Sequence, residues 1–140
     1  MKKLTTMVIM MALALIMVGG CTKNKEAVAM DASAQQITKN RYLYFKDVLV
    51  PGELKKVEGE TFILNSYGRL MLTGRIYRDS AAGFFKSAMA NDGWTFQSEY
   101  TYKKSTKIFF SKINKTSSIL ITENHFGIRV EIWVTPQKIQ

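Results

Sequence analysis

Few side chains in this sequence of 140 residues are suited to chemistry. Cys21 is the only cysteine, which excludes a disulfide within the chain and a thiolate metal cluster. His125 is the only histidine, which excludes a histidine-rich metal site. A Ser-His-Asp triad would have to use His125, but the sequence has no Gly-x-Ser-x-Gly nucleophile motif. We therefore interpret His125 as a turn residue, with a lone pH-responsive contact as the alternative.

Three glutamates on predicted strands are the remaining candidates for acid–base chemistry. Glu99, Glu123 and Glu131 would have to approach one another across strands, as the two carboxylates of a glycosidase do. Carboxylates that alternate with apolar residues on a strand are more often solvated. The sequence also lacks a Gly-x-Gly-x-x-Gly motif and a Walker loop. We expect no catalytic residue, no cofactor and no metal site, and we predict that the protein is not an enzyme.

The start of the chain carries the clearest chemical signal. Met1, Lys2 and Lys3 form a positively charged start, and Met7 to Val18 form an apolar run of 12 residues. This run is well short of the ~20 residues that span a bilayer as a helix. Gly19 and Gly20 then give a small-residue cleavage site before Cys21. The pattern resembles the bacterial lipobox, which implies a signal peptide over residues 1–20 and a diacylglycerol on Cys21, the mature N-terminus.

Residues 21–40 are predicted to be a flexible tether, because they are mostly polar and contain no aromatic side chain, with a short helix over Glu26 to Gln36 as the alternative. A lipid at Cys21 would hold the chain at a membrane surface, with no free thiol left for a Cys–His pair. The lipobox resemblance implies a cell-envelope localisation. In such proteins an aspartate after the acylated cysteine favours the inner membrane, so Thr22 favours the inner leaflet of the outer membrane in a cell with two membranes. For the first 21 residues, the alternatives to a lipoprotein signal are an ordinary signal peptide followed by a chance cysteine, or a buried apolar helix.

One helix is predicted after residue 78. Ser80 is the expected N-cap, and the following apolar residues recur at the spacing of one helical face. They are Ala81, Phe84, Phe85, Ala88 and Met89. Asn91-Asp92-Gly93 should end the helix, since glycine favours the left-handed conformation found there. Alternation in the next segment predicts four aromatic residues on one face, namely Trp94, Phe96, Tyr100 and Tyr102.

Residues 41–140 are predicted to form one α+β domain. Its strand-forming segments are joined by short polar connections, which favour antiparallel pairing. They are 60–65, 69–77, 94–102, 106–113, 117–123 and 127–135. The predicted fold is a single antiparallel sheet of about six short strands with one amphipathic helix packed on one face. The order is strand-strand-helix-strand-strand-strand-strand.

Several short motifs are distributed through this domain, at turns, on the helix face and in strands. They are Leu49-Val50-Pro51-Gly52, Gly74-Arg75-Ile76-Tyr77, Phe84-Phe85 with Met89, Gly93-Trp94, and the run from Val130 to Pro136. With these motifs most of Leu49 to Pro136 resembles a group of small uncharacterised bacterial envelope lipoproteins. The resemblance implies a lipid anchor followed by a single α+β domain, and it implies no reaction.

The second face of the sheet is a candidate partner-binding surface. In the last strand, alternation places one set of apolar residues toward the helix, namely Ile128, Val130, Ile132 and Val134. Trp133 then faces the other way, and we expect Phe109 and Ile113 on that same face. One helix covers only one face, so these residues need another cover. The candidates are residues 42–50 of the same chain, a second copy of the chain, or a different envelope protein.

Charge suggests a second surface. The chain has a net charge of +9 at pH 7, and five lysines are expected around one hairpin. They are Lys103, Lys104, Lys107, Lys112 and Lys115. Such a hairpin could bind anionic lipid or an acidic envelope polymer, while nucleic acid is not expected for an exported protein. The lysines could equally serve only to keep the domain soluble and its sheet edges unpaired.

These observations predict a non-catalytic interaction or docking module anchored in the envelope. A binder of anionic lipid or acidic polymer is the alternative. The two differ in their response to salt, because a contact made of apolar area should survive salt that abolishes a charge-driven one.

Overall fold

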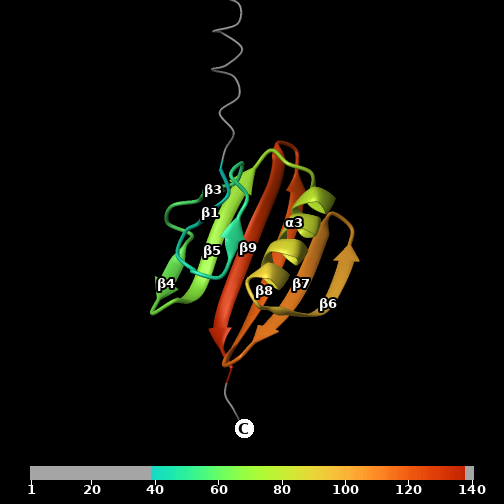
Figure 1. The fold of residues 1–140 in the computed structure, drawn as a ribbon. Coiled ribbons are helices and arrows are strands. Elements are labelled where there is room, and N and C mark those ends of the chain that lie inside the picture. The colour runs from blue at the N-terminus through green and yellow to red at the C-terminus, as the bar shows by residue number, and fades with distance from the viewer. Residues whose placement is uncertain (1–38, 138–140) are drawn as a thin grey trace, which may run out of the picture. The chain divides into compact units, whose positions relative to one another are not determined.

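A computed structural model describes residues 39–137 of the chain (Figure 1). The predicted signal peptide, Cys21 and the predicted tether up to residue 38 lie outside the described residues. The described elements are β1 (Arg41–Tyr42), β2 (Leu49–Val50), β3 (Lys55–Lys56), β4 (Phe62–Leu64), β5 (Tyr67–Gly74), α3 (Arg78–Asn91), β6 (Thr95–Tyr102), β7 (Ser105–Lys112), β8 (Lys115–Asn124) and β9 (Gly127–Pro136).

The main sheet has seven antiparallel strands in the order β3-β5-β9-β8-β7-β6, with β4 also pairing with β5. The chain leaves β5 through α3 and reaches β6 at the far edge. Strands β6 to β9 then return as a meander, until β9 pairs with β5 (Figure 1). The predicted α+β class with one helix on one antiparallel sheet is confirmed.

The predicted number of about six strands is wrong, because the edge of β5 is shared by two short strands. β4 pairs with the first part of β5 and β3 with its last part. Lys55 and Lys56 form this seventh strand through pairing with Thr73 and Leu72. Two lysines between turns lack the β-branched or aromatic character of a strand, so the sequence pattern does not reveal them.

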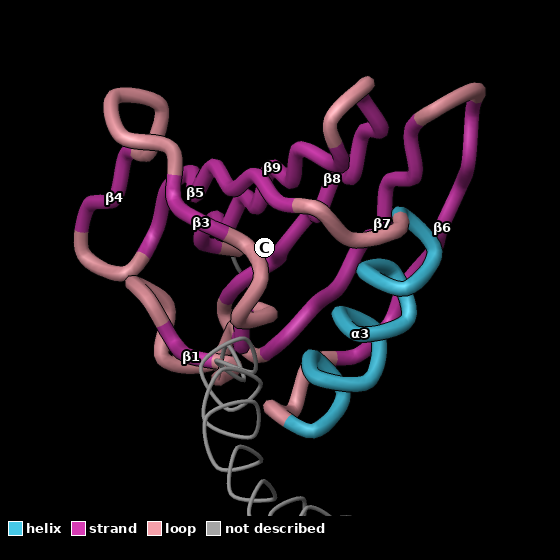
Figure 2. The backbone as a smooth tube through the Cα atoms, turned by 90° about the horizontal axis from the view of Figure 1, so that it is seen from above, coloured by secondary structure: helices cyan, strands magenta, loops and turns pink. Residues whose placement is uncertain are grey.

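One face of this sheet carries the core. Helix α3 lies on that side (Figure 2), and its Phe85 and Met89 are fully buried there. The segment before β3 packs into the same core through Phe45, Val48 and Val50. Strands β5, β7, β8 and β9 contribute the alternate residues that face this side, namely Leu70, Leu72, Ile108, Phe110, Ile119, Ile121, Ile128, Val130, Ile132 and Val134.

Helix α3 begins earlier than the sequence predicts. Its N-cap is Tyr77, whose extended backbone precedes Arg78, and no side chain caps the helix there. The Ala81 amide already donates to the Tyr77 carbonyl at 3.0 Å. Ser80 therefore lies within the first helical turn, and the prediction that it is the N-cap is wrong.

The predicted end of the helix is confirmed. Asp92 is the C-cap, and Gly93 has a φ of +81°. The Gly93 amide donates to the Ala90 carbonyl at 3.1 Å, and the Trp94 amide donates to the Met89 carbonyl at 2.9 Å. These two bonds are those of a Schellman motif, which stops the helix and turns the chain toward β6.

A bulge in β6 overturns the predicted alternation of its aromatic residues. The register with β7 shifts by one residue between Phe96 and Ser98, which leaves Gln97 as an extra residue. An inserted residue moves the following side chains to the opposite face. Phe96 thus lies on the core side, whereas Tyr100 lies on the other side, so the four aromatic residues from Trp94 to Tyr102 do not share one face.

Candidate docking surface

We call the face of the main sheet opposite α3 the outer face. The strand registers align its residues in rows that run across the sheet. In one row Arg69 of β5 pairs with Trp133 of β9, and Trp133 with Ser118 of β8. Ser118 in turn pairs with Phe109 of β7. Neighbouring strands are about 4.8 Å apart, so the backbones carrying Trp133 and Phe109 are roughly 10 Å apart, with a small serine between them.

Trp133 is fixed in position by charged neighbours. Its indole Nε1 donates to Glu131 Oε1 at 2.6 Å, and the same oxygen lies 2.8 Å from Arg69 Nε. The Arg69 guanidinium carbon also lies 6.0 Å from the centre of the indole ring. Trp133 is nonetheless 39% exposed. The outer face therefore presents a large aromatic side chain whose orientation is set before any partner binds.

Phe109 lies in a second aromatic and basic group. Its ring centroid is 6.2 Å from that of Tyr100, and Lys107 Nζ lies 5.2 Å from the Phe109 centroid. Tyr100 is 56% exposed. The sequence pattern missed Tyr100 as part of this surface, because the bulge that turns it to the outer face leaves no mark in the composition of β6.

Ile113 does not belong to the outer face. Strand β7 ends at Lys112, and Ile113 forms a tight turn with Asn114, which has a φ of +65°. Ile113 is 86% exposed in this turn. The structure therefore brings Trp133 and Phe109 together on one face, while the third predicted residue lies at the end of a hairpin.

Residues 42–50 do not cover the outer face. Phe45 and Val48 are buried in the core on the α3 side. Trp94, also in that core, donates from Nε1 to the Asp47 carbonyl at 2.7 Å, which holds the loop there. This segment was one of the predicted covers for Trp133 and Phe109, and that interpretation is wrong because the segment completes the core beside the helix.

The five lysines of the predicted basic hairpin are spread along β7 rather than gathered. Lys103 and Lys104 form the turn before this strand, while Lys112 and Lys115 flank the turn after it. A strand of this length spans roughly 25 Å, so the two turns lie at opposite ends of the sheet. Lys107 lies between them on the outer face.

Lys112 and Lys115 have a structural role. Their Nζ atoms lie 2.9 Å and 2.5 Å from Asp47 Oδ2. They also lie 5.7 Å and 5.1 Å from the centre of the Trp94 ring. Burial raises the pKa of Asp47, but hydrogen bonds from Lys115 and Lys112 outweigh it and hold the pKa below its ordinary value. These lysines bind the chain's own loop, so they are not available together as a site for a polyanion.

The other residues considered for chemistry lie apart. Glu99 pairs with Lys86 of α3 at 2.7 Å on the core side, whereas Glu131 is on the outer face and Glu123 is near the end of β8. His125 is an exposed turn residue, as predicted. Within residues 39–137, no group of three or more His, Cys, Asp or Glu is arranged to hold a metal ion. The same residues include no helix that is both long and apolar enough to cross a membrane.

Comparison of the chain with protein-family models, with curated proteins and with solved structures finds no match.

Proposed function

We propose that this protein is a lipid-anchored lipoprotein of the cell envelope whose folded domain is a non-catalytic docking module. The anchor is supported by the sequence pattern that ends at Cys21. Docking is supported above all by the row that places Trp133 and Phe109 on an exposed sheet face, on either side of Ser118. Tryptophan, tyrosine and arginine are the residues most enriched among those that dominate binding at protein interfaces, and all three occur on this face.

The charges of the outer face favour a different protein over a second copy of this chain. The face carries Arg69, Arg129 and Lys107 against Glu131. Glu131 is paired with Arg69 and Glu60 with Arg129, so Lys107 is the cation of this face without an ion-pair partner among residues 39–137. Two such faces pressed together would bury both Lys107 ammonium groups without a carboxylate partner, which is unfavourable. We therefore propose a partner that presents apolar side chains together with carboxylates.

Site-specific photocrosslinking in the intact cell tests the docking proposal. A photoreactive p-benzoylphenylalanine in place of Tyr100 would project from the outer face. The same residue in place of Ser87, which is exposed on α3, is the control. We expect a discrete adduct with another protein from position 100 and none from position 87. An adduct of twice the chain mass would instead indicate a second copy, and no adduct from position 100 would overturn the proposal.

The anchor is tested separately by mass spectrometry of the N-terminal peptide of the protein isolated from membranes. We expect a chain that begins at Cys21 and carries an acyl-glyceryl modification on it. Cys21→Ser should release the protein from the membrane fraction. An unmodified Cys21, or a mature chain that begins elsewhere, would overturn the anchor without affecting the docking experiment.

A further inference from the structure

A cleft of about 590 Å³ lies at the end of the sheet where β5 leads into α3. Its walls come from three connections that are distant in sequence, which are the β5–α3 loop, the β6–β7 turn and the β8–β9 turn. The side chains that matter here are Arg75, Tyr77, Arg78, Lys104, His125 and Phe126. None of them belongs to the outer face.

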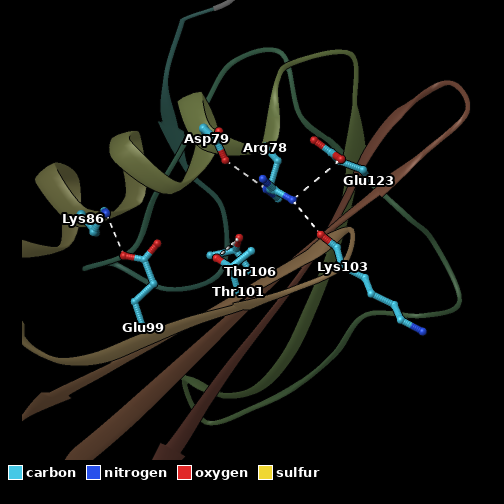
Figure 3. A network of polar contacts seen from close by, with 8 residues as sticks. All are labelled: Arg78, Asp79, Lys86, Glu99, Thr101, Lys103, Thr106 and Glu123. Carbon is cyan, nitrogen blue, oxygen red and sulfur yellow. Dashed lines mark hydrogen bonds and ion pairs between the residues drawn. The ribbon is translucent and has the colours of Figure 1, made fainter.

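The charge of this cleft is mainly positive. Arg78 is held by the chain, because its Nε lies 3.0 Å from Asp79 Oδ1 and its Nη1 donates to the Lys103 carbonyl at 3.2 Å (Figure 3). Arg75 and Lys104 have no ion-pair partner among residues 39–137. Two exposed cations are therefore free to meet an anion from outside.

Two aromatic side chains that line the same cleft as these cations are exposed to solvent. Tyr77 is 84% exposed and Phe126 is 82% exposed. The Phe126 amide donates to Asn124 Oδ1 at 2.9 Å, which orders the turn. A Cβ atom on Gly127 would lie only 2.1 Å from the Gly74 carbonyl, so this turn packs closely on the end of β5. Phe126 is thus held outward by a well-bonded turn.

The described chain begins at this same end of the sheet (Figure 1). Asn40 Oδ1 accepts from the Gly52 amide at 3.1 Å, and Arg41 donates to the Gly52 and Leu54 carbonyls at 3.1 Å and 2.8 Å. Asn40 also shares a smaller hollow with Ile76, which in turn lines the cleft. The N-terminal end of the described chain therefore lies near the cleft that carries Arg75, Tyr77, Lys104 and Phe126.

We propose that this end of the domain, defined by Arg75, Tyr77, Lys104 and Phe126, contacts the surface of an anionic lipid bilayer. Arg75 and Lys104 meet the lipid phosphates, while Phe126 and Tyr77 enter the interface between headgroups and acyl chains. Aromatic side chains favour this depth, and each cation near an anionic surface adds attraction. The inference rests on the proposed lipid anchor, which would hold this end toward the membrane. Strands directed at the bilayer would leave the outer face turned sideways, open to a partner protein.

The test uses the whole chain, purified from membranes and returned to vesicles that contain brominated lipid. A bimane fluorophore is attached to an introduced cysteine, Phe126→Cys. Ile113→Cys is the matched control, because Ile113 is equally exposed and apolar but lies at the other end of the sheet. The unsubstituted chain shows whether Cys21 itself reacts. We expect quenching at position 126, much less at 113, and stronger quenching with phosphatidylglycerol than with phosphatidylcholine alone.

A charge reversal sharpens the result. Lys104→Glu in the chain labelled at position 126 should lower the population in contact with phosphatidylglycerol roughly ten- to thirty-fold. Lys46→Glu makes the same change in an exposed lysine next to Asp47, away from the cleft, and should have little effect. Equal quenching at positions 126 and 113, or equal quenching in both lipids, would overturn the inference. Labelling of Cys21 would overturn the anchor alone, because the difference between the two labelled positions would still be measured.

Discussion

The two faces of the main sheet are built from the same strands yet differ in almost every property. Phe110 and Phe109 are neighbours on β7, and the first is buried in the core while the second is half-buried on the outer face. Trp133 and Ile132 differ in the same way on β9. The difference lies in what covers each face, because α3 and residues 41–54 both pack on one side. One face therefore carries the core, and the other leaves Trp133 and Tyr100 exposed to solvent, although Met71 on that same face is buried.

The energetic consequence is that fold and binding should be separable by substitution. A fully buried aromatic or aliphatic side chain contributes about 1.5 to 3 kcal/mol through burial alone. On the outer face Trp133, Tyr100 and Phe109 keep part of their contact with water, so they contribute less to the free energy of unfolding.

Truncation of the two neighbouring phenylalanines is the most direct comparison. Phe110→Ala should lower the free energy of unfolding by about 3 to 5 kcal/mol, because it leaves a cavity under α3. Phe109→Ala should cost about 1 kcal/mol. Chemical denaturation followed by circular dichroism measures both, and Phe85→Ala, which empties the helix side of the same core, should resemble Phe110→Ala. Equal losses for the two neighbours would mean that the outer face is also core.

The segment before β3 gives the next largest effect, because it shares the covering of the core with α3. A chain that begins at Lys39 should unfold cooperatively. A chain that begins at Leu43 loses the bonds of Asn40 and Arg41 to the loop at Gly52, and its free energy of unfolding should fall by about 2 kcal/mol. Thermal unfolding of the two chains measures this. Identical melting temperatures would show that these bonds do not hold the segment in place.

Asp47 provides a smaller and pH-dependent effect on the same segment. The pKa of Asp47 is depressed in the folded state, so its ion pairs with Lys112 and Lys115 stabilise the fold above the unfolded pKa of about 3.9. This stabilisation is lost as the pH falls through the lower folded pKa. Asp47→Asn should therefore cost about 1 kcal/mol at neutral pH and nothing in strong acid. A cost that does not change with pH would assign the role of Asp47 to packing.

Sequence patterns predict the covered face well and the other face only in part. The alternation of β9 correctly separates Ile132 from Trp133, and the spacing of Phe85 and Met89 correctly gives the buried side of α3. Both predictions depend only on local periodicity. The same periodicity fails in β6, because one inserted residue, Gln97, reverses the faces and is visible only through the pairing with β7.

Long-range contacts explain why the structure differs from the sequence predictions for the lysines and for residues 42–50. The five lysines are close in sequence, but four of them lie at two turns at opposite ends of β7, and Lys107 lies within the strand. Residues 42–50 are apolar enough to cover either face, and contacts with distant residues hold them on the core side, among them the bond from Trp94 to the Asp47 carbonyl and the ion pairs of Asp47 with Lys112 and Lys115. Glu131, two residues before Trp133, is the exception that the sequence could have revealed, since residues i and i+2 of a strand share a face. Its bond to the indole makes Trp133 an oriented side chain.

The smallest expected effect on stability, and the one that bears most on function, is that of Trp133→Ala. The side chain is 39% exposed, and its neighbours Arg69 and Glu131 remain paired without it. We therefore expect a loss of about 1 kcal/mol or less, a shift of a few degrees in the melting temperature. An oriented aromatic anchor at an interface contributes more to binding, so the photocrosslinked adduct from position 100 should fall roughly thirty-fold in yield at limiting partner. Ile113→Ala, an exposed apolar truncation away from the outer face, should change neither. If Trp133→Ala instead lowers the melting temperature by many degrees and leaves the adduct intact, Trp133 is a core residue. The proposal that the outer face is a docking surface would then lose its main support.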